Sequence, residues 1–155
     1  MLRRDANEAE RDYLKLIQNV VDRMARCSFL MKGWSVTIVA AILALNAKDL
    51  RPWLSAVGFL PVLVFWILDS YYLRQERLFR ALYSKAISEL DLALPDRTLP
   101  LFSMNTTDFE DDVASWFGVA WSRTIWPLYS FMFLVVMMVT LVAAGLLHWP
   151  CKGGC

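Results

Sequence analysis

Three long apolar stretches dominate the hydrophobic pattern of the chain, and each is long enough to cross a bilayer. The last, residues 125–148, contains no Lys, Arg, Asp or Glu and exceeds the roughly 20 apolar residues that a hydrocarbon core of about 30 Å requires. The second covers residues 53–71 and has Asp69 near its end. The first covers residues 28–47 and is interrupted by Lys32. The pattern predicts three membrane-spanning helices.

Amphipathic helices extend these spans. Residues 1–27 place apolar side chains at helical spacing with charged side chains opposite, which predicts a helix that continues into the first span. Residues 72–124 are predicted to contain cytoplasmic helical extensions and a loop. A helix follows the second span and ends at Pro95, because proline lacks the N–H that a helix interior needs, and the loop extends to Asn105. A capping box at Thr107–Glu110 predicts a third helix that runs into the last span. Residues 149–155 form a short tail.

The distribution of cations sets the expected orientation. Arg and Lys are concentrated before the first span and between the second and third, whereas only Lys48, Arg51 and Lys152 lie on the other side. By the positive-inside rule, the N-terminus and the long second connection are cytoplasmic and the C-terminus is periplasmic. The composition, 57% hydrophobic with seven Trp, fits a membrane protein. We therefore predict an all-α protein of the bacterial inner membrane, with three transmembrane helices and long cytoplasmic helical extensions, assembled as a homo-oligomeric helical bundle.

Polar residues at membrane depth are the first candidates for a functional site. A charged residue inside a span is a functional-site hypothesis by default, because its burial in lipid is costly. For Lys32 the alternative is that the ammonium reaches the nearby cytoplasmic interface along its aliphatic stem, and this is the favoured interpretation. The candidate pore-lining residues are Lys32, Ser35, Thr37 and Asn46.

A group of bases follows the second span and is the second candidate site. It has three interpretations: topogenic residues, contacts to anionic lipid headgroups, or a site for a phosphate-bearing ligand. A cyclic assembly would multiply these bases into a ring that attracts a polyanion. The group consists of Arg74, Arg77, Arg80 and Lys85.

The sequence offers no set of catalytic or metal-ligating residues. His148 lies beside Trp149 at the outer end of the last span, where an interfacial role is favoured. Cys151 and Cys155 suit a small disulfide loop better than a metal site, because no further ligands accompany them. We therefore expect no enzymatic activity, no catalytic residues, no metal and no cofactor.

Three spans rarely enclose a substrate cavity, so the pattern favours several protomers around a central conduit. Gly33, Gly58 and Gly145 provide small surfaces at which membrane helices can approach closely. We expect a homo-oligomeric ion channel that is gated from the cytoplasm.

Two segments also suggest a family. Residues 31–41, Met-Lys-Gly-Trp-Ser-Val-Thr-Ile-Val-Ala-Ala, and residues 71–80, Tyr-Tyr-Leu-Arg-Gln-Glu-Arg-Leu-Phe-Arg, resemble small bacterial membrane proteins of the SLATT-like kind. Those proteins act as effectors of nucleotide-sensing antiphage systems. A closer likeness is to the transmembrane effectors of the Hailong defence system, which are channels held closed by DNA oligomers that a partner nucleotidyltransferase makes.

The resemblance covers residues 13–94 by motif and the remainder only by architecture. It implies a channel, with a tetramer favoured, whose opening depolarises the cell in abortive infection. It also implies that the bases from Arg74 to Lys85 receive a nucleotide or a single-stranded DNA oligomer. The third span departs from the SLATT pattern and leaves open which helix lines the pore.

Two other function classes fit the pattern. A non-conducting membrane scaffold subunit would use its apolar cytoplasmic stripes to dock a soluble partner. A holin-like lysis protein fits less well, because about half of the chain is extramembrane helix, which a lesion-forming protein does not need.

Overall fold

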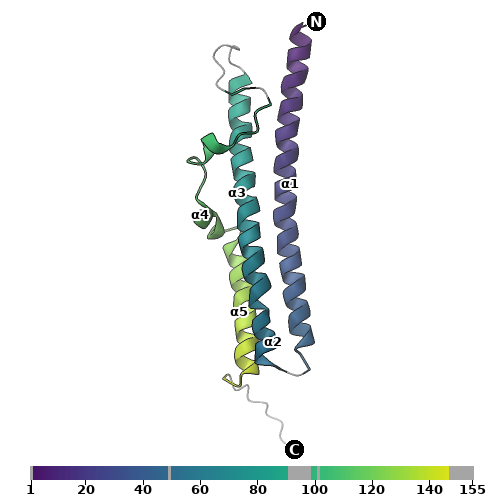
Figure 1. The fold of residues 1–155 in the computed structure, drawn as a ribbon, viewed down its shortest axis with the longest axis vertical. Coiled ribbons are helices and arrows are strands. Elements are labelled where there is room, and N and C mark those ends of the chain that lie inside the picture. Colours follow the sequence, from purple (N-terminus) through teal and green to yellow (C-terminus); the bar gives the residue numbers. More distant parts are fainter. Residues whose placement is uncertain (1, 49, 91–98, 101, 147–155) are drawn as a thin grey trace, which may run out of the picture. The chain divides into compact units, whose positions relative to one another are not determined.

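The computed structural model describes residues 2–48, 50–90, 99–100 and 102–146, and over this part of the chain it is helical with no strands. Figure 1 shows the elements in chain order. They are α1 (Leu2–Leu45), α2 (Pro52–Val57), α3 (Phe59–Leu90), the 3-10 turn η2 (Thr107–Phe109), α4 (Trp116–Ala120) and α5 (Trp126–Ala143).

The chain divides into two compact units. The bundle unit consists of Met1–Ser28 and Ser70–Val119, and the span unit consists of Phe29–Asp69 and Ala120–Cys155. Helices α1 and α3 contribute residues to both units without a break at either boundary. The prediction that the N-terminal helix continues into the first span is confirmed. The sequence of α1 favours this continuity, because its 44 residues contain no proline and a single glycine, Gly33.

The bundle unit has its own apolar core. One face of α1 and one face of α3 supply most of it, with Ile17 and Leu82 fully buried, and Phe109 from η2 belongs to the same cluster. Two polar contacts join Leu99 and Ser103 to the helices: Tyr13 donates its hydroxyl to the Ser103 carbonyl at 2.7 Å, and Glu89 accepts the Leu99 amide at 2.8 Å. The predicted apolar stripes therefore pack against each other.

The prediction of one continuous helix from Thr107 into the last span is wrong. Asn105, rather than a capping box, accepts the Thr107 amide at 3.1 Å, and only the 3-10 turn η2 follows. Helix α4 ends at Ala120, where the Trp66 indole binds its carbonyl from outside the helix. Pro127 then stands in the first turn of α5, where its missing N–H costs nothing but prevents a helix from continuing through it.

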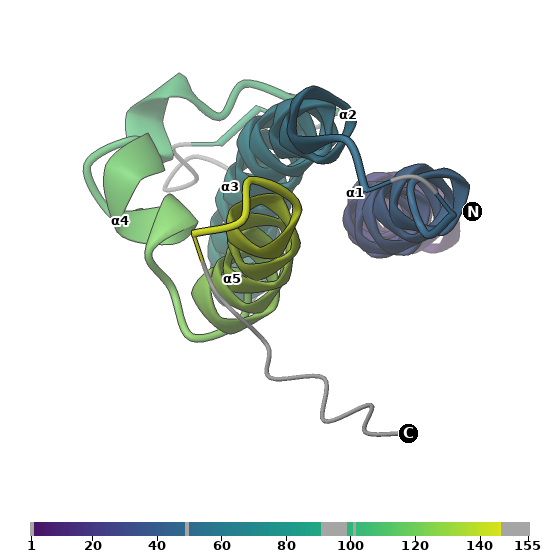
Figure 2. The ribbon, with the colours of Figure 1, turned by 90° about the horizontal axis from the view of Figure 1, so that it is seen from below.

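The described residues contain three helices that are long and apolar enough to cross a membrane, as predicted: Glu8–Asn46, Pro52–Glu89 and Trp126–Ala143. The second is interrupted at Gly58, between α2 and α3, one turn before Pro61. Pro61 has no amide hydrogen for the Val57 carbonyl, so the helix breaks there, and Gly58 donates to Ser55 at 2.9 Å instead. Figure 2 shows α2 beside α5, and a Cβ placed on Gly58 would lie 3.3 Å from Val136.

Helix α5 ends earlier than the predicted boundary at residue 148. Gly145 adopts φ +71, and the Leu146 and Gly145 amides donate to the Leu141 and Val142 carbonyls at 3.1 and 3.0 Å. This is the Schellman arrangement, which glycine permits because it has no Cβ. The 18 residues of α5 span about 27 Å at 1.5 Å per residue, close to the thickness of the hydrocarbon core. The predictions for Pro95, His148, Cys151 and Cys155 fall outside the described residues.

Candidate functional site

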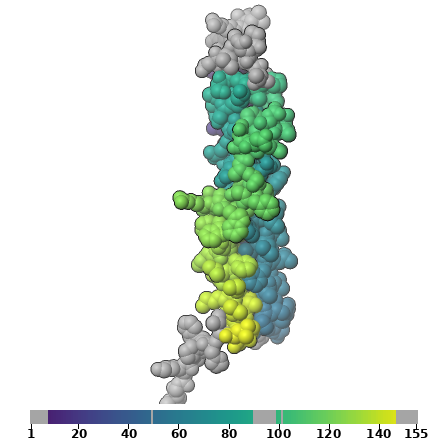
Figure 3. Space-filling model, turned by 90° about the vertical axis from the view of Figure 1, so that its left-hand side faces the viewer, coloured from purple at the N-terminus to yellow at the C-terminus, as the bar shows by residue number. Residues whose placement is uncertain are grey.

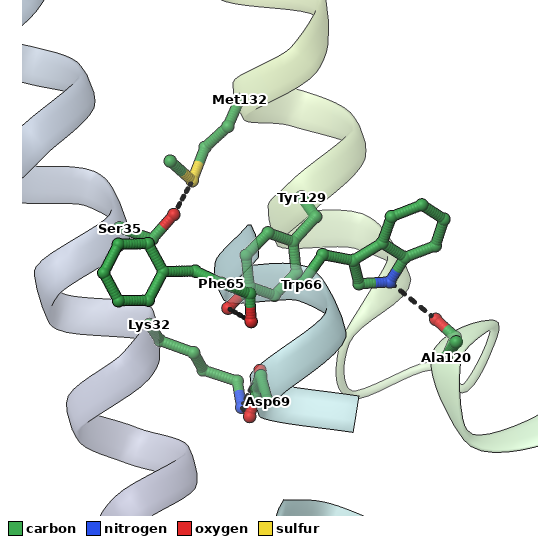
Figure 4. A network of polar contacts seen from close by, with 8 residues as sticks. All are labelled: Lys32, Ser35, Phe65, Trp66, Asp69, Ala120, Tyr129 and Met132. Atoms are coloured by element: carbon green, nitrogen blue, oxygen red, sulfur yellow. Dashed lines mark hydrogen bonds and ion pairs between the residues drawn. The ribbon is translucent and has the colours of Figure 1, made fainter. Parts of the chain in front are cut away.

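The most distinctive feature of the span unit is a buried ion pair between α1 and α3. The Lys32 ammonium lies 2.8 Å from Oδ1 and 2.7 Å from Oδ2 of Asp69, as Figure 4 shows. The Asp69 side chain is 0% exposed and that of Lys32 is 21% exposed. Because a buried carboxylate without a partner is very costly in an apolar environment, this pair holds α1 against α3.

Helix α5 contributes a third group to the same site. Tyr129 is buried, and its hydroxyl donates to the Phe65 carbonyl, one turn before Asp69, at 3.3 Å. Figure 4 shows Tyr129 of α5 next to Phe65 and Asp69 of α3. Helices α1 and α5 therefore both contact α3 within one turn of Asp69.

The site is flanked by two further polar contacts. Ser35, one turn after Lys32, is fully buried and places its hydroxyl 3.7 Å from the Met132 sulfur on α5. On the other side of α3, the Trp66 indole donates to the Ala120 carbonyl at 3.2 Å and so positions the chain that leads into α5 (Figure 4).

A second polar cluster joins α1 to α2 at the other end of the span unit. Asn46 donates its amide to the Ser55 hydroxyl and accepts the Arg51 backbone amide at 2.9 Å. Asn46 and Ser55 are both buried. Fourteen residues separate Lys32 from Asn46, and fourteen separate Ser55 from Asp69. In antiparallel helices this equal spacing, about 21 Å, lets both polar contacts form at once.

The structure gives three of the four candidate pore-lining residues a partner inside the chain. Lys32 pairs with Asp69, Ser35 contacts Met132, and Asn46 holds the α1–α2 turn. Thr37 differs, because it is exposed and its hydroxyl bonds only the Gly33 carbonyl of its own helix, at 2.9 Å.

The basic candidates lie together on α3 in the bundle unit, but two of them are paired with acids of the same helix. Arg80 lies 2.6 Å from Glu76, and Lys85 lies 3.1 Å from Glu89; both carboxylates are nearly buried. Arg77 is half-buried and has no ion pair within the described residues.

Arg74 is the most constrained of the four bases. Its Nε is buried and has no hydrogen-bond partner in the part of the chain that the structure describes. A shallow pocket of about 220 Å³ is lined by Arg80 with Asp22, Gln18 and Tyr83. Because Arg80 and Lys85 are paired with Glu76 and Glu89, Arg74 and Arg77 are the two candidate bases for which the described residues show no ion pair.

The described residues contain no group of three or more His, Cys, Asp or Glu that could hold a metal ion. Cys27, on α1, has a free thiol.

The role of Asp69 was missed in the sequence, where it only marked the end of a span. The signal that points to it is the equal spacing of polar residues in the first two spans. Lys32 and Asn46 on one span match Asp69 and Ser55 on the other when the two run antiparallel.

Comparison of the chain with protein-family models, with curated proteins and with solved structures finds no match. The likeness to SLATT-like proteins therefore stays a prediction from the two quoted segments.

The ion pair generates a prediction about stability. Lys32→Met leaves the buried Asp69 carboxylate without its cation, so we expect a loss of about 3–5 kcal/mol. Asp69→Asn should cost less, because the longer Lys32 side chain can extend toward water. The double variant K32M/D69N should recover part of the loss, since no charge remains buried. Thermal unfolding of the protein in detergent micelles measures all three.

The matched control is Lys15→Met. Lys15 pairs with Asp12 at 3.0 Å, but both side chains are mostly exposed, so its loss should stay below about 1 kcal/mol. Losses at Lys32 and Asp69 that simply add in the double variant would contradict the pairing.

Proposed function

We propose that this chain is the subunit of a homo-oligomeric membrane ion channel that is gated from the cytoplasm. The observation that carries the proposal is the Lys32–Asp69 pair, in which the Asp69 side chain is 0% exposed and that of Lys32 is 21% exposed. Ionisable residues in membrane helices are expensive and rare, and they mark pathways for ions or elements that switch.

The surface of α1 supports assembly from several copies. From Gly33 to Ala44 it exposes a face of small residues, and the space beside Gly33 is open to 4 Å. Small residues let membrane helices approach closely enough to pack, so this face suits contact with another α1. Thr37 lies on the same face and would bring a hydroxyl to such a contact.

The bundle unit supplies a means of gating. Helices α1 and α3 connect its core to the residues of the ion pair without a break. A ligand that shifts these helices in the bundle unit would therefore act on Lys32 and Asp69 through continuous helix. We propose an anionic ligand, a nucleotide or a DNA oligomer, at the Arg74–Lys85 surface, with Arg74 and Arg77 as its main contacts. Its source would be a partner nucleotidyltransferase.

The biological role that we propose is that of an effector in antiphage defence, in the bacterial inner membrane with a cytoplasmic N-terminus. This part rests on the resemblance to SLATT-like and Hailong effectors and on the concentration of cations on one side of the spans.

A scaffold is the second candidate, because apolar side chains are also exposed outside the spans. Phe102 and Phe117 of the bundle unit are 50% and 71% exposed, as expected of a surface that docks a soluble protein. The scaffold and the channel differ in whether the chain alone changes the membrane potential.

Cysteine cross-linking tests the assembly through α1. In a chain whose own cysteines are replaced by Ser, we expect Thr37→Cys to form disulfide-linked dimers in membranes on mild oxidation, because Thr37 lies on the exposed small-residue face. Val39→Cys is the matched control, since Val39 is 5% exposed and covered within its own chain. Equal cross-linking at both positions, or none at Thr37, would count against this interface.

Membrane potential tests the function. We expect bacteria that express the wild-type chain alone to depolarise soon after induction, as read with a voltage-sensitive dye. Gly33→Leu should abolish this depolarisation. The leucine side chain would fill the open space beside Gly33, which the proposed contact with a second α1 needs. Met138→Leu, at an exposed position of α5, should leave the depolarisation intact. A normal potential with wild-type protein present in the membrane fraction would favour the scaffold.

A further inference from the structure

The span unit contains an apolar groove between α3 and α5 that is separate from the ion pair. Its volume is about 370 Å³, within the range of small-molecule sites. Figure 3 views the face on which α5 (yellow-green) and the residues leading into it (green) lie. The groove is lined chiefly by Leu63, Trp66, Trp121, Trp126, Phe133 and Leu134.

The groove runs along the axis of α5. Its lining on that helix extends from Trp126, the first residue, to Leu134, two turns later. Eight residues correspond to about 12 Å of helix, whereas one leaflet contributes about 15 Å to a hydrocarbon core of about 30 Å. With α5 across a bilayer, the groove therefore lies parallel to the lipid chains and follows one leaflet through most of its depth.

Tryptophans gather at one end of the groove. The Trp66 and Trp121 rings meet edge to face at 5.8 Å, and Trp121 and Trp126 lie 6.2 Å apart. The bond from Trp66 to the Ala120 carbonyl fixes this end in place. Indole rings favour the level of the headgroups in a bilayer, so this end is the polar end and the end at Leu134 lies deeper in the hydrocarbon.

A cation stands at the polar end. Arg123 is exposed in the turn between Trp121 and Trp126. An exposed base at headgroup level attracts anionic lipid, at about 1 kcal/mol for each Lys or Arg. The arrangement thus offers an apolar groove of about one leaflet's depth next to a positive charge. It is complementary in shape and in charge to one anionic phospholipid.

We propose that this groove binds an acyl chain of an anionic phospholipid from the leaflet at the Asp69 end of the spans, with its phosphate at Arg123. The bound chain fills the space between α3 and α5 beside Tyr129, whose hydroxyl donates to the Phe65 carbonyl one turn before Asp69. This proposal does not depend on ion conduction, since a scaffold with the same spans would bind the lipid equally.

The test uses phosphatidylglycerol with a photoreactive diazirine in its acyl chain, added to vesicles that contain the full-length protein. We expect labelling, mapped by mass spectrometry, to be several-fold greater at groove residues such as Leu63 than at the exposed Leu60 on the same helix. Ser130→Phe, which fills the groove, should remove this excess, whereas Met138→Phe, outside the groove, should not. Circular dichroism establishes that each variant is folded.

Competition with unlabelled lipids tests whether the site prefers an anionic headgroup. Unlabelled phosphatidylglycerol should displace the probe better than phosphatidylcholine, and Arg123→Gln should reduce this preference about fivefold. Equal labelling of Leu63 and Leu60, or labelling unchanged by Ser130→Phe, would overturn the proposal. A Ser130→Phe variant that breaks the oligomer would overturn it too, because the groove would then hold a second copy of the chain.

Discussion

The ion pair between Lys32 and Asp69 is the constraint on which the arrangement of the span unit depends. A carboxylate that is 0% exposed among apolar helices must have its charge balanced, or the unit loses several kcal/mol. The ammonium that balances it comes from α1, and Tyr129 on α5 donates to the Phe65 carbonyl one turn earlier on α3. Dispersion and small-residue packing give membrane helices many alternative alignments. The ion pair between Lys32 and Asp69 favours a single one of these alignments.

A second polar contact fixes the alignment of α1 along the α2–α3 segment. Asn46 and Ser55 lie fourteen residues from Lys32 and Asp69 respectively, so α1 and the α2–α3 segment are joined at two points about 21 Å apart. Sliding one helix by a residue would break both contacts. The same two helices pack through Ile17 and Leu82 in the bundle unit. Under the proposed function, a ligand at the bundle unit works against these polar contacts when it opens or closes the channel.

The features of the fold that follow from hydrophobic periodicity were predictable. The three spans, the uninterrupted α1 and the packed stripes of the bundle unit all have signals in the sequence. The third helix was predicted wrongly because hydrophobic periodicity carries no information on hydrogen bonds from distant residues. The Ala120 carbonyl at the end of α4 accepts such a bond from the Trp66 indole. Gly145 was assigned to close helix packing, but its positive φ shows that it ends α5.

The candidate site was predictable only in part, and for a similar reason. Lys32 was recognised as an unusual residue, yet its partner is 37 positions away and could be found only by aligning two spans antiparallel. For the basic surface, charge counting overlooked the nearly buried Glu76 and Glu89, which pair with Arg80 and Lys85. The local sequence pattern identifies charged residues whose burial costs free energy, whereas the partners of these residues depend on the fold.

The most direct test of the central claim is electrical recording from purified wild-type protein in a planar lipid bilayer. Because the proposal assigns conduction to the chain itself, the account predicts discrete current steps that appear without any other protein. It also predicts that adding a nucleotide or a DNA oligomer on the side of the bundle unit changes how often they occur. A bilayer that stays electrically silent with folded, inserted protein, both with and without these anions, would contradict the account.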